Sequence, residues 1–116
     1  MRIKFKNIGT TLVVFLHGEI DHHWAEYFKN KVDGEILNSK TRNVIFDFEK
    51  VSFMDSSGIG AIIGRFKNIK SIRGRLLVVN VKGQLLRLFN MAGLGKLVPV
   101  CDNLDAALSM VRRESA

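Results

Sequence analysis

The residues of this chain best suited to chemistry are a carboxylate and two hydroxyls, Asp55, Ser56 and Ser57. The run 44–48 before them is apolar and β-branched, which is typical of a strand buried on both faces. Isoleucines and a phenylalanine recur at helical spacing after them, so the three polar residues lie at a strand-to-helix turn. One helix start needs one capping side chain, which leaves at least one hydroxyl free. A spare, exposed serine can accept a phosphoryl group.

The helix that follows the turn carries glycines where they cost stability. At about 100° per residue, Gly60 and Gly64 project with Lys67 and Ser71 away from the isoleucines. A glycine inside a helix costs roughly 1 kcal/mol relative to alanine. We interpret this bare strip as a face that a partner protein approaches closely, with Arg65 at its margin. The alternative is that both glycines pack under a loop.

Three segments share their order and spacing with a known family. They are Gly-Glu-Ile-Asp-His-His at 18–23, the block 53–67 that contains Asp-Ser-Ser-Gly, and Arg-Leu-Phe-Asn-Met-Ala-Gly-Leu at 87–94. With them the chain resembles the STAS family, the domain of sulphate transporters and anti-sigma factor antagonists, over nearly its whole length. Within the family it is most similar to the anti-sigma F factor antagonists of spore-forming bacteria. The Asp-Ser-Ser-Gly block is the specific part of this resemblance.

The resemblance implies a switch that works by protein binding and not by catalysis. The unphosphorylated form is expected to bind an anti-sigma factor, itself a serine kinase, and so to free a sigma factor. Phosphorylation of the serine after the aspartate, Ser56, is expected to end this binding, and a PP2C-type phosphatase to reverse it. Ser57 then becomes the expected helix cap. A general-stress antagonist of the same family is the alternative, and no cofactor is implied.

A phosphoserine at this turn should not unfold the domain, because backbone amides and the helix dipole at a helix start favour negative charge. We therefore expect its effect at the surface that the partner covers. Asp21 also follows a strand, so it should cap the first helix and converge with Asp55 on one face. The residues expected to contact the partner are Asp21, His22, His23, Met54, Asp55, Ser57, Gly58, Ile59, Gly60, Gly64 and Arg65.

Strand and helix patterns alternate, which predicts an α/β fold made of a single STAS domain over residues 1–116. We expect a mostly parallel sheet of four to five strands, about four helices, and an antiparallel N-terminal edge strand joined by a hairpin through Gly9 and Thr10. The predicted strands span 3–7, 12–17, 43–48, 75–79 and 97–100, and the predicted helices span 22–37, 57–72, 84–91 and 104–113. Gly93 and Gly95 are expected to stop the third helix, and Asp102 or Asn103 to cap the last.

Composition narrows the function classes further. The apolar runs are far shorter than the ~20 residues that cross a bilayer, so we expect no membrane insertion and a cytoplasmic protein. The single cysteine, Cys101, forms no internal disulfide and is expected to be buried. The three histidines lack metal-ligand spacing, so we expect no metal site. Trp24 and Tyr27 are expected to pack into the core.

The net charge of +7, from 18 basic and 11 acidic residues, raises nucleic-acid binding as an alternative. No aromatic-basic motif or zinc framework accompanies the charge, so we expect no direct nucleic-acid contact. An acidic protein partner suits the same surface. An enzyme is disfavoured as well, since the segment 58–64 matches no phosphate loop or dinucleotide fingerprint.

Overall fold

Strands and helices alternate through residues 1–115, the part of the chain that the computed structural model describes. The elements are β1 (Arg2–Ile8), β2 (Thr11–Ile20), α1 (Ala25–Asn38), β3 (Asn43–Met54), α2 (Ser56–Ser71), β4 (Leu76–Val79), α3 (Gly83–Met91), α4 (Leu94–Leu97), β5 (Val100–Cys101) and α5 (Leu104–Ser115). The predicted α/β class is confirmed, with five strands and five helices in these residues where about four helices were expected.

The five strands form one sheet in the order β1-β2-β3-β4-β5. β1 pairs antiparallel with β2, and the other neighbouring pairs are parallel. Gly9 takes φ +61° in the tight connection between β1 and β2, a conformation that glycine adopts without strain. The expected hairpin and antiparallel edge strand are thereby confirmed.

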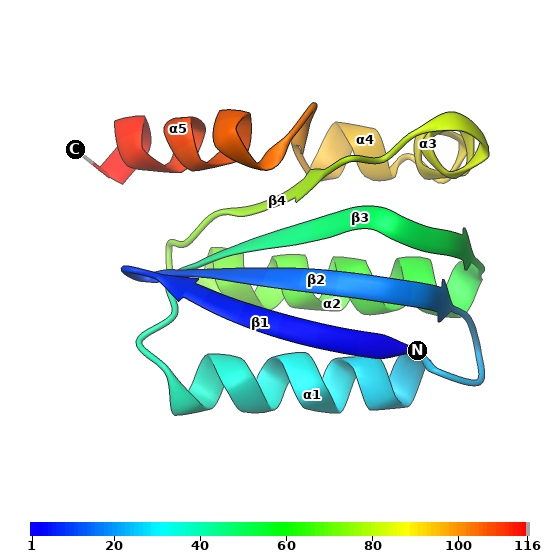
Figure 1. The fold of residues 1–116 in the computed structure, drawn as a ribbon, viewed down its shortest axis with the longest axis horizontal. Coiled ribbons are helices and arrows are strands. Elements are labelled where there is room, and N and C mark those ends of the chain that lie inside the picture. Colours follow the sequence, from blue (N-terminus) through cyan, green and yellow to red (C-terminus); the bar gives the residue numbers. More distant parts are fainter. Residues whose placement is uncertain (116) are drawn as a thin grey trace.

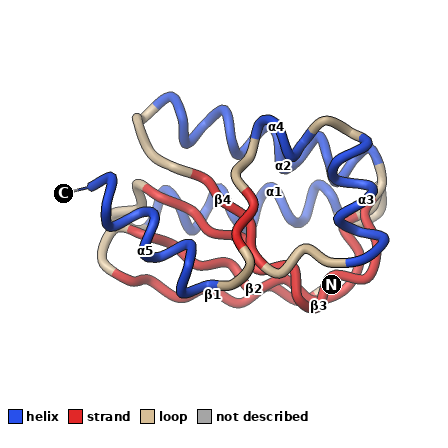
Figure 2. The backbone as a smooth tube through the Cα atoms, turned by 90° about the horizontal axis from the view of Figure 1, so that it is seen from above, coloured by secondary structure: helices blue, strands red, loops and turns tan. Residues whose placement is uncertain are grey.

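Helices cover the sheet on two sides because β3 is apolar on both of its faces. One face, with Val44 and Phe46, packs against α1 and α2. The other, with Ile45, packs against α5. Figure 1 shows α2 behind the strands and α1 below them, and Figure 2 shows α2 and α5 on opposite sides of the sheet. This three-layer arrangement leaves the ends of the strands and their loops open to partners.

The first helix begins later than predicted, at Ala25 instead of His22. β2 is followed by a turn that begins at Asp21. The Asp21 Oδ1 accepts a hydrogen bond from the Trp24 amide at 3.1 Å, and the Asp21 carbonyl accepts one from the Ala25 amide at 2.8 Å. Asp21 therefore closes the turn before the helix, and the N-cap position of α1 is Trp24, so the expectation that Asp21 caps the first helix is corrected. Trp24 and Tyr27 lie outside the core clusters and contact each other edge to face, so the prediction that they pack into the core is wrong.

The region after α3 also differs from the prediction. Gly93 ends α3 with φ +75°, as expected, but Gly95 lies inside the one-turn helix α4, and the last strand is Val100–Cys101. The predicted strand at 97–100 thus starts too early. Asn103 caps α5 by accepting from the Ala106 amide, and Cys101 is buried as predicted. Within the described residues, none of the helices combines the length and the apolar character that a membrane span requires.

Candidate functional site

The ends of β2 and β3 bring two loops together at one edge of the sheet. Ile20 and Met54, the last residues of the two strands, are direct partners in the parallel register. The loop that starts with Asp21 and the turn at Asp55 therefore leave the sheet side by side. The expected convergence of Asp21 and Asp55 is confirmed, and it follows from the parallel pairing alone.

The carboxylate of Asp55 connects these two loops. Its Oδ1 accepts hydrogen bonds from the Ser57 amide at 2.9 Å and the Gly58 amide at 3.1 Å, and its Oδ2 accepts one from the His22 amide at 2.9 Å. Partial burial alone would raise the pKa of Asp55, but the hydrogen bonds donated by Gly58, His22 and Ser57 favour the ionised form and hold its pKa below the usual value. The anionic carboxylate fixes the geometry of the turn.

The helix cap is Asp55, so the expectation that Ser57 caps α2 is wrong. Asp55 has an extended backbone with φ −107° and ψ −171°, which is the usual conformation of an N-cap residue. Ser57 already lies within the first turn of α2, where its amide is one of the donors that need a cap. A carboxylate competes better than a hydroxyl for two amides at a positive helix end.

Gly58 allows α2 to start against the end of β2. A Cβ at this position would lie 2.0 Å from the Ile20 carbonyl oxygen and 2.6 Å from Met54 Cγ, so only glycine fits. Gly58 and Met54 are both buried. The expectation that they contact a partner is therefore corrected, because they lie inside the domain and hold the turn in position.

Ser56 is the exposed hydroxyl of the turn and the first residue of α2. The two following amides already donate to Asp55. This corrects one part of the expectation that backbone amides and the helix dipole favour a phosphoserine here, because Asp55 occupies the amides of Ser57 and Gly58. A phosphoryl group here would face solvent beside the Asp55 carboxylate.

The glycines of α2 form a bare strip that continues from the turn. Gly60 is exposed and Gly64 is half-buried. A Cβ on either would meet no other atom of the described residues within 4 Å, apart from the chain neighbours and the helix backbone. The alternative in which a loop covers these glycines is therefore wrong. Ile59, also half-buried, packs against the core cluster beside the strip.

Arg65 does not border this strip, contrary to expectation. Its side chain is buried between α2 and α1, and its Nε lies 3.0 Å from Asp33 Oδ1 of α1. The ion pair lacks the alignment of a hydrogen bond, and no described residue accepts a bond from Arg65 Nη1. Residue 65 is three positions after Ile62, which places it on the core side of the helix. Arg65 therefore lies buried between α1 and α2, with Asp33 as its counter-charge.

The rim of the site includes residues that sequence reasoning did not select. His22 and His23 are exposed as expected, and the His23 ring packs edge to face on Trp24 at 4.9 Å between centroids. Phe53 is 49% exposed and shares a hollow of about 320 Å³ with Leu88 and Met91 of α3. Side chains alternate between the two faces of a strand, so Phe53 points away from its buried neighbour Met54. This alternation could have predicted from the sequence that Phe53 is exposed.

Comparison with known proteins places this geometry in a family. Residues 2–107 match the model of the STAS domain. The chain is 34% identical over 109 residues to the anti-sigma F factor antagonist of Paenibacillus polymyxa, covering 94% of this chain and 93% of the relative. It is 32% identical over 88 residues to the anti-sigma-B factor antagonist of Listeria monocytogenes, covering 75% of each.

Among solved structures, the chain resembles the Bacillus cell fate determinant SpoIIAA in its phosphorylated form. The TM-score is 0.72 and the identity 30%, over 95% of this chain and 99% of the other. The chain therefore belongs to the STAS domain family, within its group of anti-sigma factor antagonists.

Proposed function

We propose that this chain is a phosphorylation-controlled antagonist that binds an anti-sigma factor through the turn at Ser56 and the glycine strip of α2. The anti-sigma factor is at the same time the serine kinase that modifies Ser56, and a PP2C-type phosphatase restores the active form. The observation that carries the proposal is an exposed hydroxyl on a turn whose backbone donors are already used by Asp55.

Because Asp55 occupies the backbone amides of the turn, phosphorylation of Ser56 should change partner binding and leave the fold intact. A phosphoserine adds about −1.5 to −2 charge, and at Ser56 this charge would stand beside the ionised Asp55. A partner that covers the turn must desolvate both groups. A buried charge left without a partner costs about 2 to 5 kcal/mol, which is a thirtyfold or larger loss of affinity.

The partner surface combines the residues of the proposed site that remain accessible. Its centre is Ser56 with Asp55 and Ser57, and Asp21 with His22 and His23 forms one flank. Ile59, Gly60 and Gly64 form the other flank along α2. Met54, Gly58 and Arg65 support this surface from inside the domain.

The modification is tested by incubating the chain with ATP and the anti-sigma F factor of the same organism, and then mapping the phosphate by mass spectrometry. Phosphate should appear on Ser56, be absent from Ser56→Ala, and persist in Ser57→Ala, which serves as the matched control. Modification of Ser57 in the wild-type chain would rule out the assigned residue.

The pathway is distinguished by the partner. The relatives named above include antagonists of both anti-sigma F and anti-sigma-B factors, with the longer and more identical match to the former. We therefore propose the sporulation type. Binding measured against both anti-sigma factors should favour the anti-sigma F factor, and tighter binding to the anti-sigma-B factor would assign the stress pathway instead.

A further inference from the structure

A second concave surface lies on the sheet face that α5 does not reach. α5 packs on β3, β4 and β5, and Figure 1 shows β1 and β2 in front with no helix drawn over them. Within the described residues, β1, β2 and β3 enclose there a cavity of about 440 Å³, within the range of pockets that hold small molecules. Its lining residues are Arg2, Lys4, Phe15, Leu16, His17, Asp47, Glu49 and Lys50.

Strand register explains how these side chains come together. Lys4, Phe15 and Asp47 form one row across β1, β2 and β3, and Arg2, His17 and Lys50 form the next. Between the two rows β3 carries an extra residue, because Phe15 pairs with Asp47 but His17 pairs with Lys50. Such a bulge bends the strand and redirects side chains. It aligns Lys50 with the row of Arg2 and hollows this face.

Among the described residues, three cations line the cavity beside two carboxylates, and neither lysine pairs with a carboxylate. In residues 1–115 neither Lys4 nor Lys50 makes an ion pair or a side-chain hydrogen bond, although Asp47 and Glu49 line the same cavity. Asp47 Oδ1 instead accepts from the Glu49 amide at 2.9 Å and from Asn80 Nδ2 at 3.1 Å. Both ammonium groups are therefore available to a ligand.

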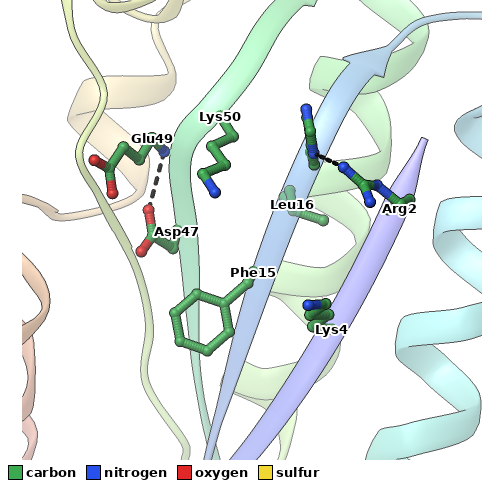
Figure 3. A pocket seen from close by; sticks show the side chains of 8 residues that line it. Arg2, Lys4, Phe15, Leu16, Asp47, Glu49 and Lys50 are labelled. Atoms are coloured by element: carbon green, nitrogen blue, oxygen red, sulfur yellow. Dashed lines mark hydrogen bonds between the residues drawn. The ribbon is translucent and has the colours of Figure 1, made fainter.

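A half-buried aromatic ring provides the apolar part of the same surface. Figure 3 shows Lys4 and Lys50 on either side of β2, with the Phe15 ring on the same side as Lys50. Arg2 Nη2 lies 2.8 Å from His17 Nδ1, so the guanidinium donates to this ring nitrogen and keeps its charge beside the cavity. Cations around a half-buried ring suit an anionic group attached to a planar or apolar body.

We propose that this cavity binds a small organic anion, a phosphate or carboxylate held by Arg2, Lys4 and Lys50 whose apolar body lies against Phe15. The site lies on the face opposite α1 and α2, and it does not depend on the switch at Ser56. The competing explanation is that lysines on β1 only protect an edge strand from pairing with another chain.

The test is an amide-resolved NMR titration of the full chain with phenyl phosphate, inorganic phosphate and phenylacetate. Phenyl phosphate should give saturable shifts confined to β1, β2 and the middle of β3, and inorganic phosphate should bind several-fold more weakly because it lacks the ring. Tighter binding of phenyl phosphate than of phenylacetate assigns a phosphate ligand, and the reverse order assigns a carboxylate. Either order supports the site.

Lysine substitutions inside and outside the cavity test whether phenyl phosphate binds at this site. Lys4→Gln and Lys50→Gln should each weaken phenyl phosphate binding about fivefold, since each removes one charged donor. Lys40→Gln, an exposed lysine outside the cavity, should leave it unchanged, as should Ser56→Asp. The proposal is overturned if no titration saturates or if Lys40→Gln weakens binding as much as Lys4→Gln. It is equally overturned if Lys4→Gln promotes self-association without affecting phenyl phosphate.

Discussion

Replacement of Gly64 by alanine separates the stability of α2 from its use as a binding face. Gly64 lies in the middle of α2, and a Cβ there meets no other described atom within 4 Å outside the local helix. The methyl group therefore fits the free protein without a clash. Alanine should raise the free energy of unfolding by roughly 0.5 to 1 kcal/mol, because it loses less backbone entropy on folding.

The same methyl group should harm the complex. A partner packed closely on the strip would have to move away or distort, and overpacking of this kind typically costs about 1 to 3 kcal/mol. The affinity should then fall about tenfold. With an unfolding entropy of ~2.1 cal/mol/K per residue, 116 residues give a Tm increase of up to about 4 °C.

The control is Gly34→Ala in α1. Gly34 is also helical, half-buried and free of atoms within 4 Å of a Cβ, so it should give a similar Tm increase. It lies outside the proposed surface and should not change binding. Calorimetric melting and titration with the anti-sigma factor measure both effects. The reasoning fails if Gly64→Ala lowers the Tm, or if both variants bind the partner equally well.

Three further predictions concern the scaffold of the site. Gly58→Ala should lower the free energy of unfolding by about 2 to 4 kcal/mol in urea titrations, because a Cβ collides with the Ile20 carbonyl; an effect under about 0.5 kcal/mol would refute this close approach. Because Asp55 has a lowered pKa when folded, its ionised form stabilises the protein above the unfolded-state pKa, and this contribution is lost as the pH falls through the folded-state pKa. The stability difference between wild type and Asp55→Asn should therefore be constant near neutral pH and shrink below about pH 4 in acid titrations, and a difference that grows there would contradict the assigned hydrogen bonds. Asp33→Asn should destabilise the protein by about 1 to 3 kcal/mol since it leaves the buried Arg65 without a counter-charge, whereas Arg65→Met should be close to neutral; the opposite order would show that an unpaired buried Arg65 is not what costs stability.

Hydrophobic periodicity and the motif order were enough to predict the sheet, its antiparallel edge and the turn at Ser56. Parallel strands also required Asp21 and Asp55 to converge, and the structure confirms this. These features depend on patterns that repeat over many residues or on topology, and both can be read from one sequence.

Errors arose where a single side chain decides between alternatives. The cap went to Asp55 and not to Ser57 because the His22 amide, distant in sequence, also binds that carboxylate. Arg65 was assigned to the surface because a charged residue is usually exposed, yet Asp33 on another helix provides its counter-charge. A single helix pattern carries no information about such tertiary partners.

The proposed switch predicts a large change in the affinity of this chain for the anti-sigma F factor. Isothermal titration of the anti-sigma F factor into the unphosphorylated chain and into the chain phosphorylated on Ser56 measures it. The phosphorylated form should bind at least about thirtyfold more weakly while its Tm stays within a few degrees of the unmodified form. Equal affinities, or a weaker affinity explained by loss of the folded state, would contradict a switch that acts at the exposed surface of the turn.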